Sequence, residues 1–350
     1  MSDRKIAEGV ECIRQAEKCL KTSLLKWKPD YDGAASEYAK AATNFKNAKS
    51  YAQCKDCLLR AAECHKQNRS YFSAAKSIEQ AALVSKDMGD LIETANLVER
   101  ACQLFQEYGT PDTAALSLDK GAKIVESKFP ERALKLYLKA ADVVLLEDRP
   151  RQAAEYLSKA ARLQVKLRLL DDAVTTIKHE IEMHTSTENR NAIGRLIVAL
   201  VIVHLTRGDY VAADKVFRDG ISCVEDDEIY TLETLLEAYD QEDPETAYKA
   251  LHSPFIMHMD VEYAKLARAL HVPGSILSEG RCKEETSAPS RAIHSPPAEV
   301  PPVVPQISVD QATDDMNQLS VAPDEEKDLP DGKGKTVGGD DDDEYDEGLC

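Results

Sequence analysis

The amino-acid sequence predicts an all-α protein: a right-handed solenoid of antiparallel helical hairpins, closed by a C-terminal helical bundle and followed by a disordered acidic tail. Three observations lead to this fold class. Pairs of alanines recur at intervals of about 20 residues, which is the mark of an internal repeat. Residues that favour turns stand between the recurrences, and after residue 280 the composition becomes proline-rich and acidic.

The repeat first appears as an amphipathic stripe. It comprises Tyr31, Ala34, Ala35, Tyr38, Ala41, Ala42, Phe45 and Ala48. This spacing places the apolar side chains on one face of an α-helix. The stripe recurs as Tyr71, Ala74, Ala75, Ile78, Ala81 and Ala82, and alanine pairs continue to Ala212 and Ala213. We expect helices of roughly 15 residues joined by links of about five, a length that makes neighbouring helices antiparallel.

The links contain residues that stop and start helices. Gly89, Gly109 and Gly208 are helix stops, and Pro111, Pro130 and Pro150 stand near later helix starts. Alanine pairs let neighbouring helices approach closely, so residues 1–215 are predicted to stack as a solenoid similar to tetratricopeptide repeats. The unit is nearer 40 residues than the usual 34, so it is a variant of that repeat.

Two further segments complete the predicted organisation. Residues 216–280 still read as helices, and we expect them to form a compact bundle that caps the array. Residues 281–350 carry 8 of the chain's 15 prolines, 6 basic and 18 acidic residues, and one aromatic residue, Tyr345. A segment of this composition cannot bury enough apolar surface to offset its ordering entropy, which predicts a disordered linker and tail.

Composition and charge exclude several classes of protein. The formal net charge of −18 disfavours nonspecific nucleic-acid binding, which needs a basic surface. The number of cysteines, nine, is odd. The sequence contains no run of about 18 apolar residues, the length that a membrane-spanning helix needs. The first residues lack a signal region, and Ser2 replaces the glycine that myristoylation needs. We therefore expect reduced thiols and a cytoplasmic protein.

Two clusters resemble metal sites. Cys54, Cys57, Cys64 and His65 could bind zinc, but the cysteines occupy helix-face positions that alanine fills elsewhere, so buried thiols are the favoured interpretation. His179-Glu180 with His184 resembles a zinc-protease helix. That motif needs histidines four residues apart, whereas these are five apart.

Two motifs near the end of the chain are also incomplete. Gly332 to Thr336 ends like a phosphate-binding loop, but Leu329 stands where the loop needs glycine. Cys350 is the last residue, and prenylation needs a cysteine four from the end. We therefore expect no catalytic residue, no cofactor and no metal, and a protein that is not an enzyme.

A short loop between the first two predicted helices has an unusual composition. Its residues are Leu24, Leu25, Lys26, Trp27 and Lys28. Apolar side chains flanked by lysines suit a lipid interface with anionic headgroups. The alternative, which composition leaves equally open, is a loop folded onto the first hairpin with Trp27 buried.

The acidic end of the chain closes on one apolar residue. The cluster comprises Asp340, Asp341, Asp342, Asp343, Glu344, Asp346 and Glu347, followed by Leu349. Such a tail could dock into a basic groove with a small pocket. A solvated tail without a partner is the alternative, and composition alone favours it.

Several long strings of residues resemble the soluble NSF attachment proteins, in particular their gamma form. They are Lys26 to Asp32, Ala34 to Tyr38, Gly109 to Ala115, Asp209 to Ala213, Leu235 to Gln241, Asp260 to Leu266, Val272 to Gly274 and Gly348 to Cys350. The resemblance covers residues 1 to about 275 and the last dozen residues, whereas the stretch from about 281 to 338 is longer and less familiar, which suggests a lineage-specific linker.

The resemblance implies an adaptor that binds assembled SNARE complexes, the syntaxin-type four-helix bundles, and recruits the hexameric ATPase NSF to take them apart. It implies that the loop around Trp27 contacts membrane and that the tail from Asp340 to Leu349 engages NSF. The expected location is the cytoplasm, peripherally on ER, Golgi and vesicle membranes. A general scaffold without NSF recruitment is the alternative.

One departure concerns the concave face, where the resemblance implies that basic residues of the alpha form grip the acidic SNARE bundle. Thr110, Leu116 and Glu155 align with three of these positions and are not basic. Basic character remains at Lys159, Arg190 and Arg195, which we expect to face the bundle. The departure implies weaker binding or a different preferred bundle.

Overall fold

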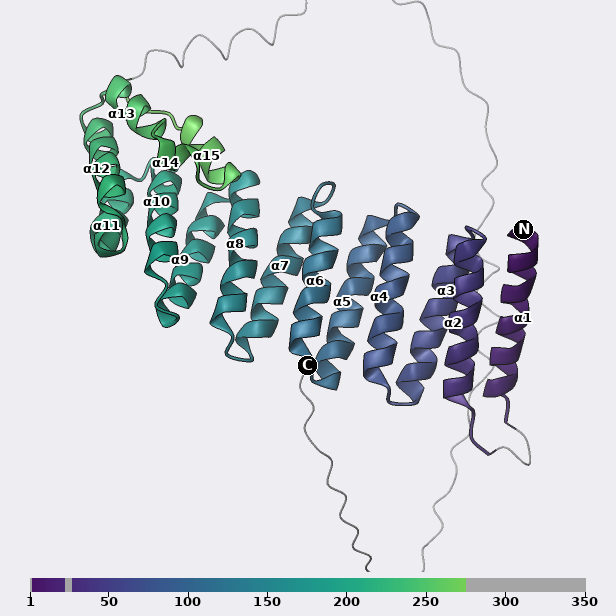
Figure 1. The fold of residues 1–350 in the computed structure, drawn as a ribbon. Helices are drawn as coiled ribbons and strands as arrows, with labels where there is room; N and C mark the ends of the chain where they lie inside the picture. The colour runs from purple at the N-terminus through teal and green to yellow at the C-terminus, as the bar shows by residue number, and fades with distance from the viewer. Residues whose placement is uncertain (1, 23–26, 275–350) are drawn as a thin grey trace, which may run out of the picture. The chain divides into compact units, whose positions relative to one another are not determined.

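The computed structural model describes residues 2–22 and 27–274, and these residues are all-α. The first eleven helices form the array in Figure 1. They are α1 (Ser2–Leu20), α2 (Tyr31–Asn47), α3 (Tyr51–Gln67), α4 (Tyr71–Asp87), α5 (Leu91–Tyr108), α6 (Pro111–Val125), α7 (Pro130–Leu145), α8 (Pro150–Lys166), α9 (Leu170–Ser186), α10 (Arg190–Thr206) and α11 (Tyr210–Gly220). The acidic tail, with the residues from Asp340 to Leu349, lies outside the described residues.

The predicted repeat is confirmed. Each helix from α3 to α11 begins 19 or 20 residues after the one before, and each packs antiparallel on its neighbours (Figure 1). The helices are longer than predicted, most of them 17 residues, and most of the turns are correspondingly shorter than five residues.

A left-handed residue after the helix and two backbone hydrogen bonds explain the short turns. After α2, Lys49 adopts a left-handed conformation with φ of 59°. Its N–H donates to the carbonyl of Lys46 at 2.9 Å, and the N–H of Ser50 donates to that of Phe45 at 2.8 Å. These two bonds satisfy the last carbonyls of the helix and reverse the chain at once. Left-handed residues recur in most later turns: Arg69, Gly89, Gly109, Asp148, Arg168, Glu188 and Gly208.

The alanine pairs form the seams between helices. Ala34, Ala35, Ala74, Ala75, Ala114 and Ala115 are among the many alanines with no exposed surface. Larger side chains such as Phe45 and Phe105 fill the space beside these seams. Small residues on one helix pack closely against large ones on the next. The core of each hairpin is therefore completed by the hairpins beside it.

The C-terminal helices share a second core. They are η1 (Ile221–Cys223), α12 (Asp226–Asp240), α13 (Pro244–Leu251), α14 (Pro254–Met257) and α15 (Val261–Arg268). The buried residues of this core run from Ala161 to Val272, so α9 and α10 belong to it as well. The second core thus begins before residue 215, where the sequence predicted the boundary between solenoid and bundle. That boundary stays a prediction.

Helix α10 is the centre of this second core. Every side chain from Leu196 to Leu205 is buried, and α9, α11 and α15 pack around the helix. Gly194 lets η1 approach α10 closely, because a Cβ there would lie 2.3 Å from the carbonyl oxygen of Cys223. Among the described residues, none of the helices has the length and apolar composition that crossing a bilayer requires.

Candidate functional site: charged surfaces along the array

A network of ion pairs links α6 and α8 of the array. The Lys159 ammonium on α8 lies 2.6 Å from Asp119 Oδ1 on α6. Lys123, one turn beyond Asp119, lies 2.7 Å from its Oδ2. The Lys159 ammonium also lies 5.9 Å from the ring centroid of Tyr137 and 5.1 Å from that of Tyr156, close enough for cation–π attraction.

Asp119 is the buried anchor of this network. Its side chain is 7% exposed. Burial alone would raise the pKa of this carboxyl, but hydrogen bonds from Lys123 and Lys159 outweigh burial and hold the pKa below its usual value. Lys159 therefore joins α6 to α8, and part of its charge is already neutralised within the chain.

Further cations surround Lys159. A hollow of about 340 Å³ lies between α6, α7, α8 and α15. Lys123, Lys159, Arg162 and Lys166 line it, together with the acidic Glu126, Asp260 and Glu262. Arg162 is paired with Asp260 at 3.1 Å, whereas Lys166 has no ion-pair partner within residues 2–22 and 27–274. Lys123, Lys159 and Arg162 are thus already paired with Asp119 or Asp260, which leaves Lys166 as the cation of the hollow that an acidic partner could bind.

The three basic residues predicted to face the SNARE bundle do not share one site. Lys159 lines the hollow just described, while Arg190 borders a larger groove of about 880 Å³ between α9, α10 and α11. Arg195 lines a third hollow of about 380 Å³, beside Glu228 and Tyr263. Arg190 and Arg195 are five residues apart on α10, which turns them to different sides of the helix.

The positions that depart from the family have these structural roles. Thr110 precedes α6, and its hydroxyl donates to the carbonyl of Phe105 at 3.1 Å. Leu116 is 52% exposed on α6, and Glu155 is exposed on α8. Leu116 therefore adds an exposed apolar side chain to the helix that carries Asp119.

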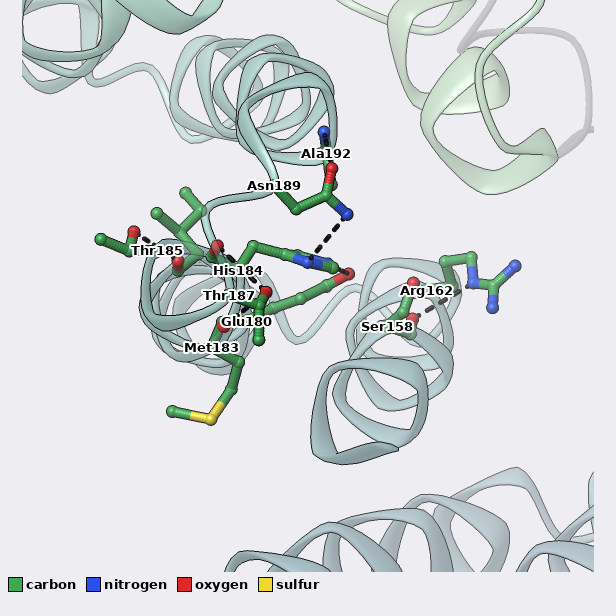
Figure 2. Close-up of polar contacts among 10 residues, drawn as sticks. Ser158, Arg162, Glu180, Met183, His184, Thr185, Thr187, Asn189 and Ala192 are labelled. Carbon is green, nitrogen blue, oxygen red and sulfur yellow. Dashed lines mark hydrogen bonds and ion pairs between the residues drawn. The ribbon is translucent and has the colours of Figure 1, made fainter. Parts of the chain in front are cut away.

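A buried carboxyl lies where the array meets the C-terminal helices. Glu180 on α9 is 5% exposed, and Figure 2 shows it pointing toward α8, beside His184. Its Oε1 lies 3.9 Å from His184 Nε2, and its Oε2 has no hydrogen-bond partner within the described residues. The nearby Arg162 guanidinium instead binds the Ser158 carbonyl and Asp260.

The surroundings of Glu180 disfavour its charge. Burial raises its pKa to about 7, although the Ser158 hydroxyl and the Arg162 charge act in the opposite direction. The buried Tyr263 of α15 also has a raised pKa, first because of burial and then because of Glu180. This buried cluster is not among the predicted sites. The signal for it was a glutamate at a stripe position, seven residues after Ala173 and three after Ile177.

The loop before α2 exposes its tryptophan. Trp27 is 89% exposed and Lys28 is also exposed, so the alternative in which Trp27 is buried on the first hairpin is wrong. The backbone N–H of Asp30 donates to the carbonyl of Cys19 at 3.0 Å, and the Asp30 carboxylate caps α2. Leu24, Leu25 and Lys26 lie outside the described residues.

The cysteines that resembled a zinc site are core residues. Cys54, Cys57 and Cys64 are buried, and burial raises the pKa of the Cys57 thiol to about 12. A thiol held in its protonated form is a poor metal ligand. Within the part of the chain that the structure describes, no group of three or more histidine, cysteine or acidic side chains could hold a metal ion.

The fold and these surfaces define a helical-repeat scaffold. A family model described as "Soluble NSF attachment protein, SNAP" matches residues 7–253. The chain therefore belongs to the soluble NSF attachment protein family, as the sequence predicted.

Named relatives agree with this assignment. The chain is 28% identical over 279 residues to the gamma-soluble NSF attachment protein of Dictyostelium discoideum, an alignment that covers 78% of this chain and 86% of the relative. It is 26% identical to the gamma-soluble NSF attachment protein of Arabidopsis thaliana, with 74% and 90% covered. The alpha-soluble NSF attachment protein of Mus musculus is 28% identical over 49% of this chain and 60% of the relative.

Proposed function

We propose that this chain is an adaptor that binds assembled SNARE complexes and recruits the ATPase NSF for their disassembly, in intracellular vesicle transport and membrane fusion. The observation that carries the proposal is the family match over residues 7–253, supported by relatives whose names state attachment to NSF. The adaptor needs no active site of its own, because NSF hydrolyses ATP.

The basic hollow on α6, α8 and α15 supplies a surface for the SNARE bundle. Lys166 is the cleanest residue to test, because it lines the hollow, is exposed and has no ion-pair partner within the described residues. Lys159 is less suitable, since its replacement would also break the link to Asp119.

Membrane contact and NSF recruitment are assigned to the two other predicted surfaces. The loop from Leu24 to Lys28 would hold the adaptor peripherally on membranes, consistent with the exposed Trp27. The acidic tail from Asp340 to Glu347, with Leu349, would engage NSF through charge and one apolar anchor.

The test is a pull-down on bead-bound SNARE complex. The full-length chain is compared with a chain truncated after Gly339, with purified NSF and a non-hydrolysable ATP analogue. We expect both chains to bind the complex and only the full-length chain to capture NSF. If neither chain captures NSF, the recruitment role is refuted and the general scaffold remains. If neither binds the complex, the SNARE role is refuted.

Two point variants refine the SNARE assignment. Lys166→Gln is expected to weaken binding to the complex, because it removes an unpaired cation from the hollow. Lys86→Gln is the matched control, an exposed lysine at the end of α4 that makes no ion pair within the described residues. Equal binding by the two variants would exclude the hollow as the contact surface.

A further inference from the structure

Every second connection of the array lies along the same edge, and the first three of these are neighbours in space. Because neighbouring helices are antiparallel, the loop before α2, the turn between α3 and α4, and the end of α5 share the edge that is lower in Figure 1. Contacts tie them together. Asn68 Nδ2 in the second turn donates to Asp32 Oδ1 at the start of α2, at 2.7 Å, and the rings of Phe72 and Tyr108 lie 5.4 Å apart.

This edge presents four outward side chains, which we call the edge patch: Trp27, Lys28, Arg69 and Tyr108. Trp27 is 89% exposed and Tyr108 is 56% exposed. Lys28 and Arg69 are exposed and make no ion pair within residues 2–22 and 27–274. Arg69 stands at the left-handed position of the turn between α3 and α4, with φ of 58°, and its side chain is exposed there.

The acidic side chains nearest to Lys28 in the sequence are engaged elsewhere. The Asp30 carboxylate accepts the N–H of Gly33 at 2.9 Å as the cap of α2. The Asp32 carboxylate accepts the amide of Asn68. Both carboxylates are therefore held against backbone or turn groups, and neither pairs with Lys28 or Arg69.

The chemistry of the edge patch matches one partner. Tryptophan and tyrosine favour the boundary between water and lipid, and lysine and arginine favour anionic headgroups. Side chains at the tips of successive turns along one edge are also those that a flat surface reaches together. We propose that Arg69 and Tyr108 extend the membrane contact beyond the loop of Trp27, so that three connections bind an anionic bilayer as one edge. This inference rests on the membrane contact proposed above.

The test measures co-sedimentation of the full chain with phosphatidylcholine vesicles, with and without phosphatidylserine. Arg69→Gln is expected to bind the phosphatidylserine vesicles about fivefold more weakly, the effect of one cation near an anionic surface. Its binding to pure phosphatidylcholine should be unchanged. Tyr108→Ser is expected to bind both kinds of vesicle more weakly, because its ring contributes without regard to headgroup charge.

Arg168→Gln is a matched control. Arg168 occupies the same left-handed turn position, with φ of 61°, is exposed and makes no ion pair within the described residues, but it lies between α8 and α9 on the opposite edge. It should bind both vesicles as the unaltered chain does. If Arg69→Gln and Arg168→Gln lost vesicle binding equally, the net charge of the protein would explain the loss, and the edge patch would be overturned as the contact surface.

A Trp27→Ser variant separates this inference from the proposal on which it rests. If Trp27→Ser abolishes binding while Arg69→Gln and Tyr108→Ser bind normally, the loop alone contacts membrane and the extended edge is overturned. If the unaltered chain binds neither kind of vesicle, the membrane contact itself is refuted, and the edge patch with it.

Discussion

Glu180 allows a prediction about how the junction between the array and the C-terminal helices responds to pH. The perturbation is Glu180→Gln, which keeps the size of the side chain and removes its charge. The folded chain raises the pKa of this carboxyl from the ordinary 4.5 to about 7. Since one pKa unit corresponds to about 1.4 kcal/mol, the charged form is disfavoured in the folded state by about 3 kcal/mol.

The sign follows from proton binding. Between pH 4.5 and 7 the folded state holds a proton on Glu180 that the unfolded state has lost, so the stability of the junction falls as pH rises through this window. The penalty approaches its full value about one pH unit above 7. The amide side chain of the Glu180→Gln variant does not titrate, so the variant should gain stability relative to the unaltered chain by about 1 kcal/mol between pH 6 and pH 8.

The assay is hydrogen–deuterium exchange, because repeat arrays open in parts rather than as one unit. After correction for intrinsic rates, peptides covering α9 and α15 should show a protection ratio, variant over unaltered chain, that grows about five- to tenfold from pH 6 to pH 8. Glu182→Gln is the control, an exposed glutamate on the same helix. A ratio that stays constant with pH, or the same growth in the control, would refute the reasoning.

Three other perturbations test the packing and the charge network. Lys159→Met should lower the unfolding free energy by about 1–3 kcal/mol in thermal denaturation, because it leaves the buried Asp119 with one cation. Lys120→Met should cost less, because it breaks only a 4.0 Å pair with Glu79, a carboxylate that keeps its 3.0 Å pair with Lys76. Gly194→Ala should cost at least about 1–3 kcal/mol, because its Cβ would meet the carbonyl oxygen of Cys223 at 2.3 Å; an unchanged melting temperature would contradict this close approach. Cys57 should resist iodoacetamide at pH 8 in the native chain and react after denaturation, as followed by mass spectrometry, because burial raises its pKa to about 12; rapid native labelling would show that the α2–α4 core opens.

Local patterns in the sequence were sufficient to predict the helices. The alanine stripes at Ala34 and Ala74 and the prolines at Pro111, Pro130 and Pro150 predicted helix positions that the structure confirms. The glycine stops predicted only some of the turns. Lys49, Arg69, Arg168 and Glu188 take the same left-handed conformation without glycine, since the two hydrogen bonds of each turn, rather than the side chain, hold it.

What the sequence by itself determined is therefore the repeat, the helical class and the family, because these depend on spacing along one chain. What only the tertiary structure decided is which charges are available. The sequence gives no sign that Lys159 has an ion-pair partner, yet its ammonium lies 2.6 Å from the carboxylate of Asp119, 40 residues earlier. Arg190 and Arg195 are near in sequence but border different hollows. The stacking of hairpins brings distant residues together and turns adjacent ones apart, and no periodicity within a single helix contains that information.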